Sequence, residues 1–112
     1  MHDADAAPSA AIQAVIERID LLGAQVEQFL PFGQTLCTNN NPSDDEGLQY
    51  WGSVFYTCRN YLCKCEAIVL VHGEQLEAVS SEHMFRLTKI QDTIADFLLQ
   101  LEGQLVSRVC HD

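Results

Sequence analysis

One apolar seam in the middle of the chain limits the possible folds more than any other feature. With Leu48 at position a of a heptad, the a and d positions up to Val79 all hold apolar residues or cysteine, except for His72. A seam of this period over 32 residues is typical of a long helix that packs along its whole length. The segment therefore predicts a helix over about residues 44–79, at the centre of an all-α fold.

A second helical pattern precedes the seam. Across residues 9–30 the apolar residues recur at the a, d and e positions of a heptad, which gives one stripe wide enough to face a core. Ser9 is a suitable N-cap for this helix. Pro31 disfavours helical geometry at the residue before it, so we expect the helix to end there and a loop to occupy residues 31–43.

A third helix is predicted at about residues 81–109, where apolar residues recur with the period of a helix. The turn before it has two candidate positions. One is at residues 79–82, where two serines precede an acidic first turn. The other is at residues 72–74, where Gly73 is a suitable C-cap. We favour the turn at the serine pair.

The central helix begins with a capping signal. Ser43 is followed three residues later by Glu46, so the serine side chain can accept the amide proton of the glutamate while the glutamate reaches back. The acidic residues that follow Ser43 also complement the helix dipole. Because this cluster lacks the alternating carboxylates of a calcium loop, we interpret Ser43 and Glu46 as a capping box and not as metal ligands.

These patterns predict a three-helix chain that forms an antiparallel helical bundle. The bundle is expected to be a single domain over residues 9–109, which is an ordinary size for one core. A flexible acidic segment at residues 1–8 precedes it, and a short tail at residues 110–112 follows.

The central helix carries a second, thinner apolar stripe. Its members Tyr56, Cys63 and Leu70 are seven residues apart and lie roughly 140° around the helix from the main seam. A helix with two apolar stripes usually contacts neighbours on two sides. The first helix, at about 21 residues, is also too short to cover the central one along its length. We therefore expect a homodimer with these three residues at its interface, in which Cys63 could meet its own copy across a two-fold axis.

The charge of the chain limits the classes of partner that it can bind. Six lysines and arginines stand against 16 aspartates and glutamates, for a net charge of −10. Such a surface repels phosphate backbones and anionic lipids, so we expect neither nucleic-acid nor membrane binding, and a protein partner with a basic surface. The acidic start of the chain does not have the pattern of a secretory signal, and no apolar run has the length of a membrane span. The five cysteines match no zinc motif, and we expect mostly reduced thiols in the cytoplasm.

Three cysteines and a histidine lie close together in the central segment and raise the question of a metal site. Cys58, Cys65 and His72 are seven residues apart, so on a helix neighbours are separated by ~10.5 Å along the axis. One ion cannot bind two of them from the same helix. We interpret Cys58 and Cys65 as core residues and His72 as a half-buried histidine, and we expect no cofactor. A metal site at these three residues would need ligands from another helix or subunit.

No sequence motif indicates catalysis. The chain contains no Glu-x-x-His, Cys-x-x-Cys, phosphate loop or nucleophile elbow, so we do not expect an enzyme. The leading hypothesis is a small, acidic, non-enzymatic interaction module, regulator-like or chaperone-like, that self-associates. The alternative is a thiol- or metal-based sensor that uses the cysteines of the central helix. For the thiol version, Cys63 is the best candidate, because Arg59 lies four residues before it and Lys64 lies beside it.

Overall fold

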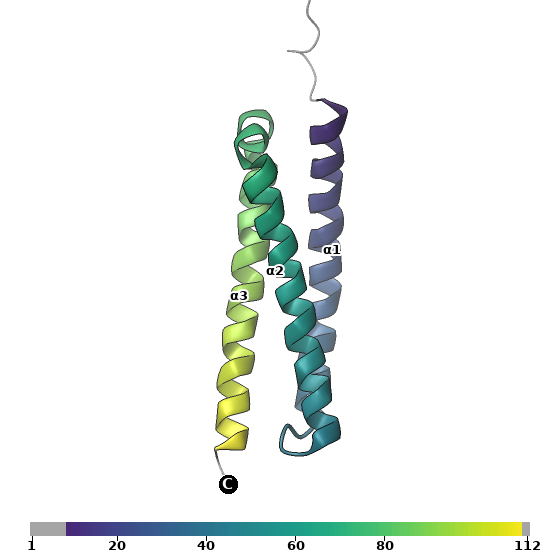
Figure 1. The fold of residues 1–112 in the computed structure, drawn as a ribbon, viewed down its shortest axis with the longest axis vertical. Helices are drawn as coiled ribbons and strands as arrows, with labels where there is room; N and C mark the ends of the chain where they lie inside the picture. Colours follow the sequence, from purple (N-terminus) through teal and green to yellow (C-terminus); the bar gives the residue numbers. More distant parts are fainter. Residues whose placement is uncertain (1–8, 111–112) are drawn as a thin grey trace, which may run out of the picture.

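The computed structural model describes residues 9–110 as three long helices, and this part of the chain contains no strand (Figure 1). In chain order the helices are α1 (Ala10–Thr38), α2 (Asp45–Val79) and α3 (Ser81–Val109). Consecutive helices run in opposite directions, and each helix packs against both others. The predicted all-α helical bundle is confirmed, and its completion by a second copy stays a prediction. The expectations for residues 1–8 and 111–112 lie outside the described residues.

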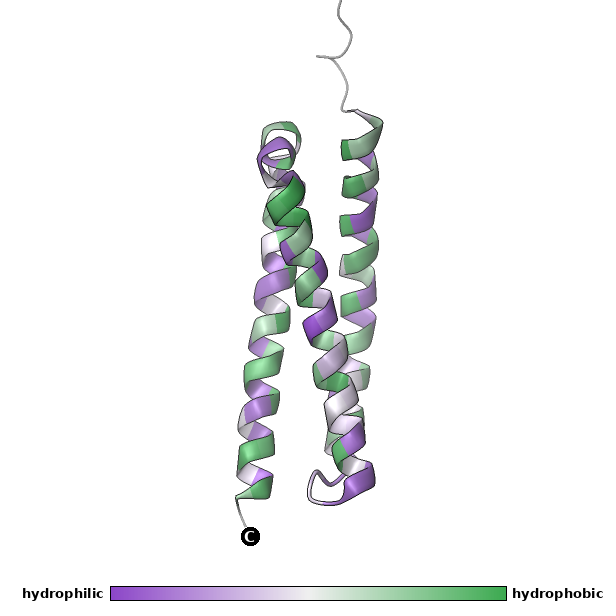
Figure 2. Ribbon diagram, in the orientation of Figure 1, coloured by the Kyte–Doolittle hydropathy of each residue, from purple (hydrophilic) through white to green (hydrophobic). Residues whose placement is uncertain are grey.

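The core follows the predicted seam of α2 closely in the middle and less closely at the ends. Trp51, Cys58 and Cys65, all at d positions, are at most 1% exposed. At the two ends the seam loosens, since Leu48 is 50% exposed and Val79 is 43% exposed. Figure 2 shows the corresponding pattern, in which hydrophobic segments recur along every helix and are strongest in the upper half of α2. The seam of α2 is therefore most deeply buried at Trp51, Cys58, Cys65 and Leu76.

Charged side chains lie outside this core. Within the described residues no polar or charged residue is buried. The core therefore holds together through apolar packing and not through buried ion pairs, which are costly to desolvate. No helix within residues 9–110 combines the length and the apolar character that crossing a membrane requires.

The first helix does not end at Pro31, and this prediction is wrong. α1 continues to Thr38, so residues that we expected in a loop are helical. Pro31 lies on the exposed side of the helix, where its missing hydrogen bond leaves a carbonyl group that water can reach. Beyond it Gly33 and Cys37 are buried, and a Cβ atom on Gly33 would lie 3.1 Å from Val54 Cγ1 of α2. This close packing against α2 offsets the cost of a proline in the helix interior, about 3 kcal/mol.

The longer first helix changes one argument for a dimer. α1 has 29 residues and α2 has 35, so α1 covers more of α2 than the sequence predicted. The length of α1 therefore gives no reason to expect that part of α2 is left uncovered. A second contact on α2 would have to lie on the side that α1 and α3 both leave open.

The predicted capping box at the start of α2 is also wrong. The N-cap is Asp44, whose Oδ1 accepts the amide proton of Gly47 at 2.7 Å. Ser43 lies outside the helix and donates its amide proton to Asn41 Oδ1 at 2.9 Å. Glu46 lies in the first turn, where its charge complements the helix dipole. Serine and aspartate are similarly good N-caps, and the contact with Asn41 holds Ser43 in the loop.

The turn between α2 and α3 lies at the serine pair that we favoured. Ser80 is the C-cap of α2 and the N-cap of α3 at once. Its amide donates to the Leu76 carbonyl at 2.7 Å, and its Oγ accepts the amide proton of His83 at 3.4 Å. Gly73 is buried inside α2, which excludes the alternative turn at residues 72–74.

Candidate functional site

The second stripe of α2 lies on the outside of the bundle. Tyr56 is 69% exposed, Leu70 is 86% exposed, and Cys63 between them is exposed as well. We call these three residues the outer stripe. Cys63 and the buried Cys65 are two positions apart and so point ~200° apart on the helix. The outer stripe is therefore accessible to a partner, and its contact with a second copy stays a prediction.

The surface around the outer stripe carries its charges at one edge and at the end beyond Leu70. Further exposed residues on this face of α2 are the uncharged Gly52, Ser53, Asn60, Ala67 and Val71, and also Glu74, which lies one helical turn after Leu70. Arg59 and Glu66 lie along one edge of the face. An exposed apolar strip with a polar rim is typical of a protein contact.

The inner cysteines behave as core residues. Burial raises the pKa of the Cys37, Cys58 and Cys65 thiols from 9.0 to about 11, because a thiolate in the core would lose its hydration. A charge on Cys37 would raise the pKa of Cys58 further, since these thiols of α1 and α2 are near each other. All three are protonated at neutral pH, whereas a reactive cysteine needs a lowered pKa.

The candidate metal ligands do not come together. Cys58 and Cys65 are fully buried, and His72 is half-buried further along α2. Within residues 9–110 no group of three or more histidine, cysteine, aspartate or glutamate side chains is placed to hold a metal ion. The structure therefore provides no ligand set that includes these residues.

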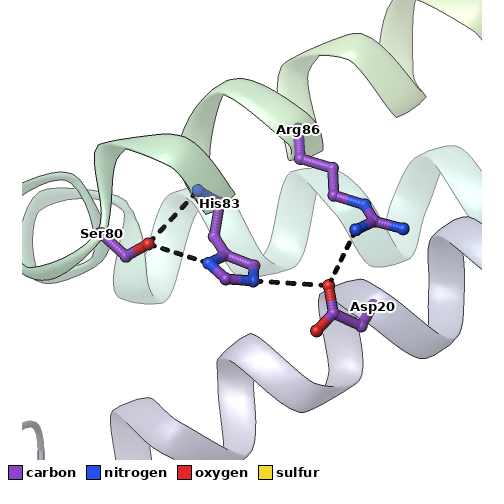
Figure 3. Close-up of polar contacts among 4 residues, drawn as sticks. All are labelled: Asp20, Ser80, His83 and Arg86. Atoms are coloured by element: carbon purple, nitrogen blue, oxygen red, sulfur yellow. Dashed lines mark hydrogen bonds and ion pairs between the residues drawn. The ribbon is translucent and has the colours of Figure 1, made fainter.

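A polar junction ties the start of α3 to α1 (Figure 3). Ser80 Oγ lies 2.8 Å from His83 Nδ1, and His83 Nε2 lies 3.4 Å from Asp20 Oδ1. Arg86 Nη1 lies 3.2 Å from the same aspartate oxygen. The tautomer with the proton on Nε2 satisfies all these contacts, because Ser80 then donates to Nδ1 and His83 donates to Asp20.

The order serine, histidine, aspartate is also that of a hydrolase triad, but the geometry favours a structural role. Ser80 Oγ accepts a backbone amide proton as a helix cap, which a nucleophile does not do. Asp20 is 48% exposed and shares its oxygen with Arg86, whereas the aspartate of a triad is buried and serves the histidine. We interpret the junction as a tie between α1 and α3.

A glycine makes room for this tie. A Cβ atom on Gly23 would lie 3.3 Å from both Arg86 Nη2 and Ile90 Cδ1. Beside it a groove runs between α1 and α3, in which Lys89 Nζ lies 5.8 Å from the centre of the Phe85 ring. The walls of the groove carry two basic and two acidic residues, so its charge favours no class of ligand.

The opposite end of the bundle is closed by Arg108 and Trp51. Arg108 of α3 donates to the carbonyl oxygens of Cys37, Thr38 and Asn40 at 3.1–3.3 Å. Trp51 Nε1 donates to the Asn40 carbonyl at 2.9 Å, and the Arg108 guanidinium lies 5.8 Å from the Trp51 ring centre. These bonds satisfy carbonyl groups that the end of α1 leaves without helical partners.

Sequence reasoning missed most of these polar contacts. It assigned no role to Asp20, Arg86 or Arg108. The spacing of Ser80 and His83 could have indicated the cap contact, since an N-cap and the third helical residue are neighbours. The contacts of Asp20 and Arg108 cross between helices, and no local spacing encodes them.

Comparisons with known proteins assign no function. No protein-family model matches the chain, and searches of curated proteins and of solved structures found no match. The function is therefore inferred from the geometry described above.

Proposed function

We propose that the chain is a small, cytoplasmic, non-enzymatic interaction module that self-associates through the outer stripe of α2 and offers an acidic surface to a protein partner. The carrying observation is the exposure of Tyr56 and Leu70 on a helix whose opposite face is closely packed. Removing such side chains from water favours association by about 25 cal/mol per Å² of apolar surface. The buried seam of α2 holds the helix in place and so lowers the entropic cost of presenting them.

Exposed apolar residues also share one heptad position on α3, namely Phe85, Leu99 and Val106. Leu99 is 66% exposed on α3, where Asp92 and Asp96 lie on the same face. The outer stripe differs because its three members follow one another at seven-residue steps with no charged residue at the same heptad position between them, whereas Asp92 interrupts the repeat on α3.

The acidic surface supports the second half of the proposal. The net charge of −10 favours encounter with a basic protein surface and disfavours nucleic acids. Such a module would act as a regulator-like or chaperone-like binding protein, with the homodimer as its working unit.

A second candidate function is a thiol sensor centred on Cys63. This residue is exposed, Arg59 lies one helical turn before it, and a nearby cation favours the thiolate. The buried Cys58 and Cys65 give this reading no support, because burial raises their pKa to about 11. The sensor hypothesis therefore rests on Cys63 alone and ranks second.

Sedimentation equilibrium on the reduced protein tests the proposal. We expect a dimer for the unchanged chain and a shift to monomer for Leu70→Glu, since the glutamate would be buried without a partner. The matched control is Leu21→Glu, which changes a leucine that is 59% exposed on α1 and should leave the dimer intact. A monomeric unchanged chain, or equal loss of the dimer in both variants, would contradict self-association through this stripe.

The same measurement separates the two candidates. A dimer in reductant that Cys63→Ser preserves supports the interaction module. A dimer that appears only after oxidation, and that Cys63→Ser abolishes, supports the sensor instead.

A further inference from the structure

We infer that the outer stripe binds α2 of a second copy in antiparallel orientation, around a two-fold axis at Cys63. This inference rests on the proposed self-association and adds its orientation and register. It follows from two independent features of the outward face of α2: the spacing of its apolar residues, and the order of the charges along its edge.

The apolar residues are placed symmetrically about Cys63. Tyr56 lies seven residues before it and Leu70 lies seven residues after it, so both are ~10.5 Å from it along the helix axis. In an antiparallel pair centred on Cys63, Tyr56 therefore lies opposite the partner's Leu70, and Leu70 opposite the partner's Tyr56. A two-fold interface requires this kind of self-complementary contact.

The charges at the edge of the face select the same arrangement. Arg59 lies four residues before Cys63 and Glu66 lies three residues after it. Both are exposed, and neither forms an ion pair within residues 9–110. Because they are seven residues apart, they lie on one edge of the helix. The antiparallel arrangement places Arg59 beside the partner's Glu66 twice, whereas a parallel two-fold pair would place the two charged edges on opposite sides of the interface, where Arg59 and Glu66 would not meet.

The remaining residues allow a close approach. Asn60 and Ala67 flank Cys63 on the same face, one helical turn away on either side, and neither is bulky. Lys64, the other cation nearby, lies with its Nζ 5.9 Å from the centre of the Tyr61 ring, on the side of α2 that adjoins α1. Its charge is therefore directed away from the proposed axis.

Charge reversal tests the register. Arg59→Glu and Glu66→Arg each place like charges at two points of the antiparallel interface, so each should weaken its homodimer about tenfold or more. Combining the two changes in one chain restores opposite charges and should restore the dimer. The matched control is Lys64→Glu, which lies away from the axis and should leave the dimerisation constant within about twofold. Far-UV circular dichroism verifies that these surface variants remain folded.

A cross-link at Cys63 tests the axis. Two Cys63 thiols on the axis would form one disulfide with oxidised glutathione, which accepts their two electrons and leaves as two reduced molecules with the two protons. Such a bond needs Cα atoms within about 7 Å, which facing positions on closely packed helices provide. The experiment uses Cys110→Ser to remove the other exposed thiol, and we expect a reducible dimer that Cys63→Ser abolishes.

The outcomes separate this inference from the proposal on which it rests. A dimer that responds to both reversals, regains strength when they are combined and cross-links at Cys63 supports the register. A dimer that is broken by Leu70→Glu but ignores both reversals and does not cross-link overturns the register and leaves self-association intact. A monomeric unchanged chain overturns both.

Discussion

Where α1 meets α2, residues 39–44 form a loop over which Trp51 and Arg108 donate to main-chain carbonyl groups. Where α2 meets α3, at the opposite end, the single residue Ser80 separates the helices, and side-chain contacts with Asp20 hold the turn to α1. We call these regions the loop end and the turn end. The loop end is stabilised mainly by side chains of Trp51 and Arg108 that donate hydrogen bonds to backbone carbonyl oxygens. The turn end is stabilised by contacts with the half-exposed carboxylate of Asp20.

The difference teaches how each end should respond to change. Ion pairs at a surface contribute little and are screened by salt, so the turn end should tolerate substitution and respond to ionic strength. Hydrogen bonds to backbone carbonyl groups depend on geometry, and a partly buried carbonyl such as that of Cys37 costs more when it is left without a donor. The loop end should therefore be the more easily damaged and the less sensitive to salt.

The largest expected effect comes from alkaline pH. Burial raises the pKa of Cys37, Cys58 and Cys65 from 9.0 to about 11, and the first two come from the loop half of the bundle. The folded chain therefore keeps these protons at pH values where the unfolded chain has lost them. Stability is complete below pH 9 and falls between pH 9 and about 11, by up to ~1.4 kcal/mol per pH unit for each thiol.

Urea unfolding at pH 8, 9 and 10 measures this loss. Cys58→Ala should reduce the slope of the unfolding free energy against pH by about a third, since it removes one of three buried thiols. Cys63→Ser, at an exposed thiol, should leave the slope unchanged. Equal slopes for Cys58→Ala and the unchanged chain would contradict the assignment.

The next largest effect on stability is expected from a substitution at the start of α2. Gly47 packs directly on the backbone of Asn41, and a Cβ atom there would overlap with the Asn41 carbonyl oxygen. Gly47→Ala should therefore lower the free energy of unfolding by about 2–3 kcal/mol. Gly103→Ala is the control, because nothing lies within 4 Å of its Cβ position and it should stabilise α3 by about 0.5–1 kcal/mol. Similar results for the two variants would show that the loop end is not tightly packed.

Removing the guanidinium group at the loop end should have a moderate effect. Arg108→Met leaves the Cys37, Thr38 and Asn40 carbonyl oxygens with fewer donors and should cost about 1–2 kcal/mol in chemical denaturation. Arg108→Lys keeps the charge but loses the planar fork, so it should recover only part of that loss. Full recovery by lysine would mean that charge, and not geometry, closes this end.

The smallest effect is expected at the turn end. Asp20→Asn weakens the contacts with His83 and Arg86 at a carboxylate that is 48% exposed, and should cost about 0.5 kcal/mol at low salt. The difference should shrink in ~1 M salt, where the Debye length is short. Glu17→Gln on the same helix is the control, because Glu17 forms no ion pair within residues 9–110. Thermal melts at low and high salt compare the stability lost in the two variants. A loss in Asp20→Asn that salt leaves unchanged would mean that the turn end does not depend on screened ion pairs and resembles the loop end.

The sequence predicted the turn end better than the loop end. At the turn end the position of the turn at Ser80 was recovered, because capping residues are local signals. At the loop end two local rules gave the wrong result. Pro31 normally ends a helix, but the packing of Gly33 against Val54 extends α1 past it. Ser43 and Asp44 are both good N-caps, and a contact with the loop decides between them.

At the candidate site, too, some features were predicted from local spacing and others were not. The heptad spacing correctly placed Tyr56, Cys63 and Leu70 away from the main seam, and their role at an interface stays a prediction. The contacts of Arg108 were not predicted, since about 70 residues separate it from its acceptors at the end of α1. Such contacts depend on how helices are aligned along the bundle, which no single segment specifies.

The single-residue link at Ser80 also has a consequence for the order of folding. Closing a short connection costs little chain entropy, so α2 and α3 can pair early as a hairpin, before the longer connection brings α1 into place. This nascent hairpin already carries the whole outward face of α2. During synthesis the hairpin emerges after α1. The apolar face of α1 therefore stays exposed until α2 and α3 have been synthesised and can bury it.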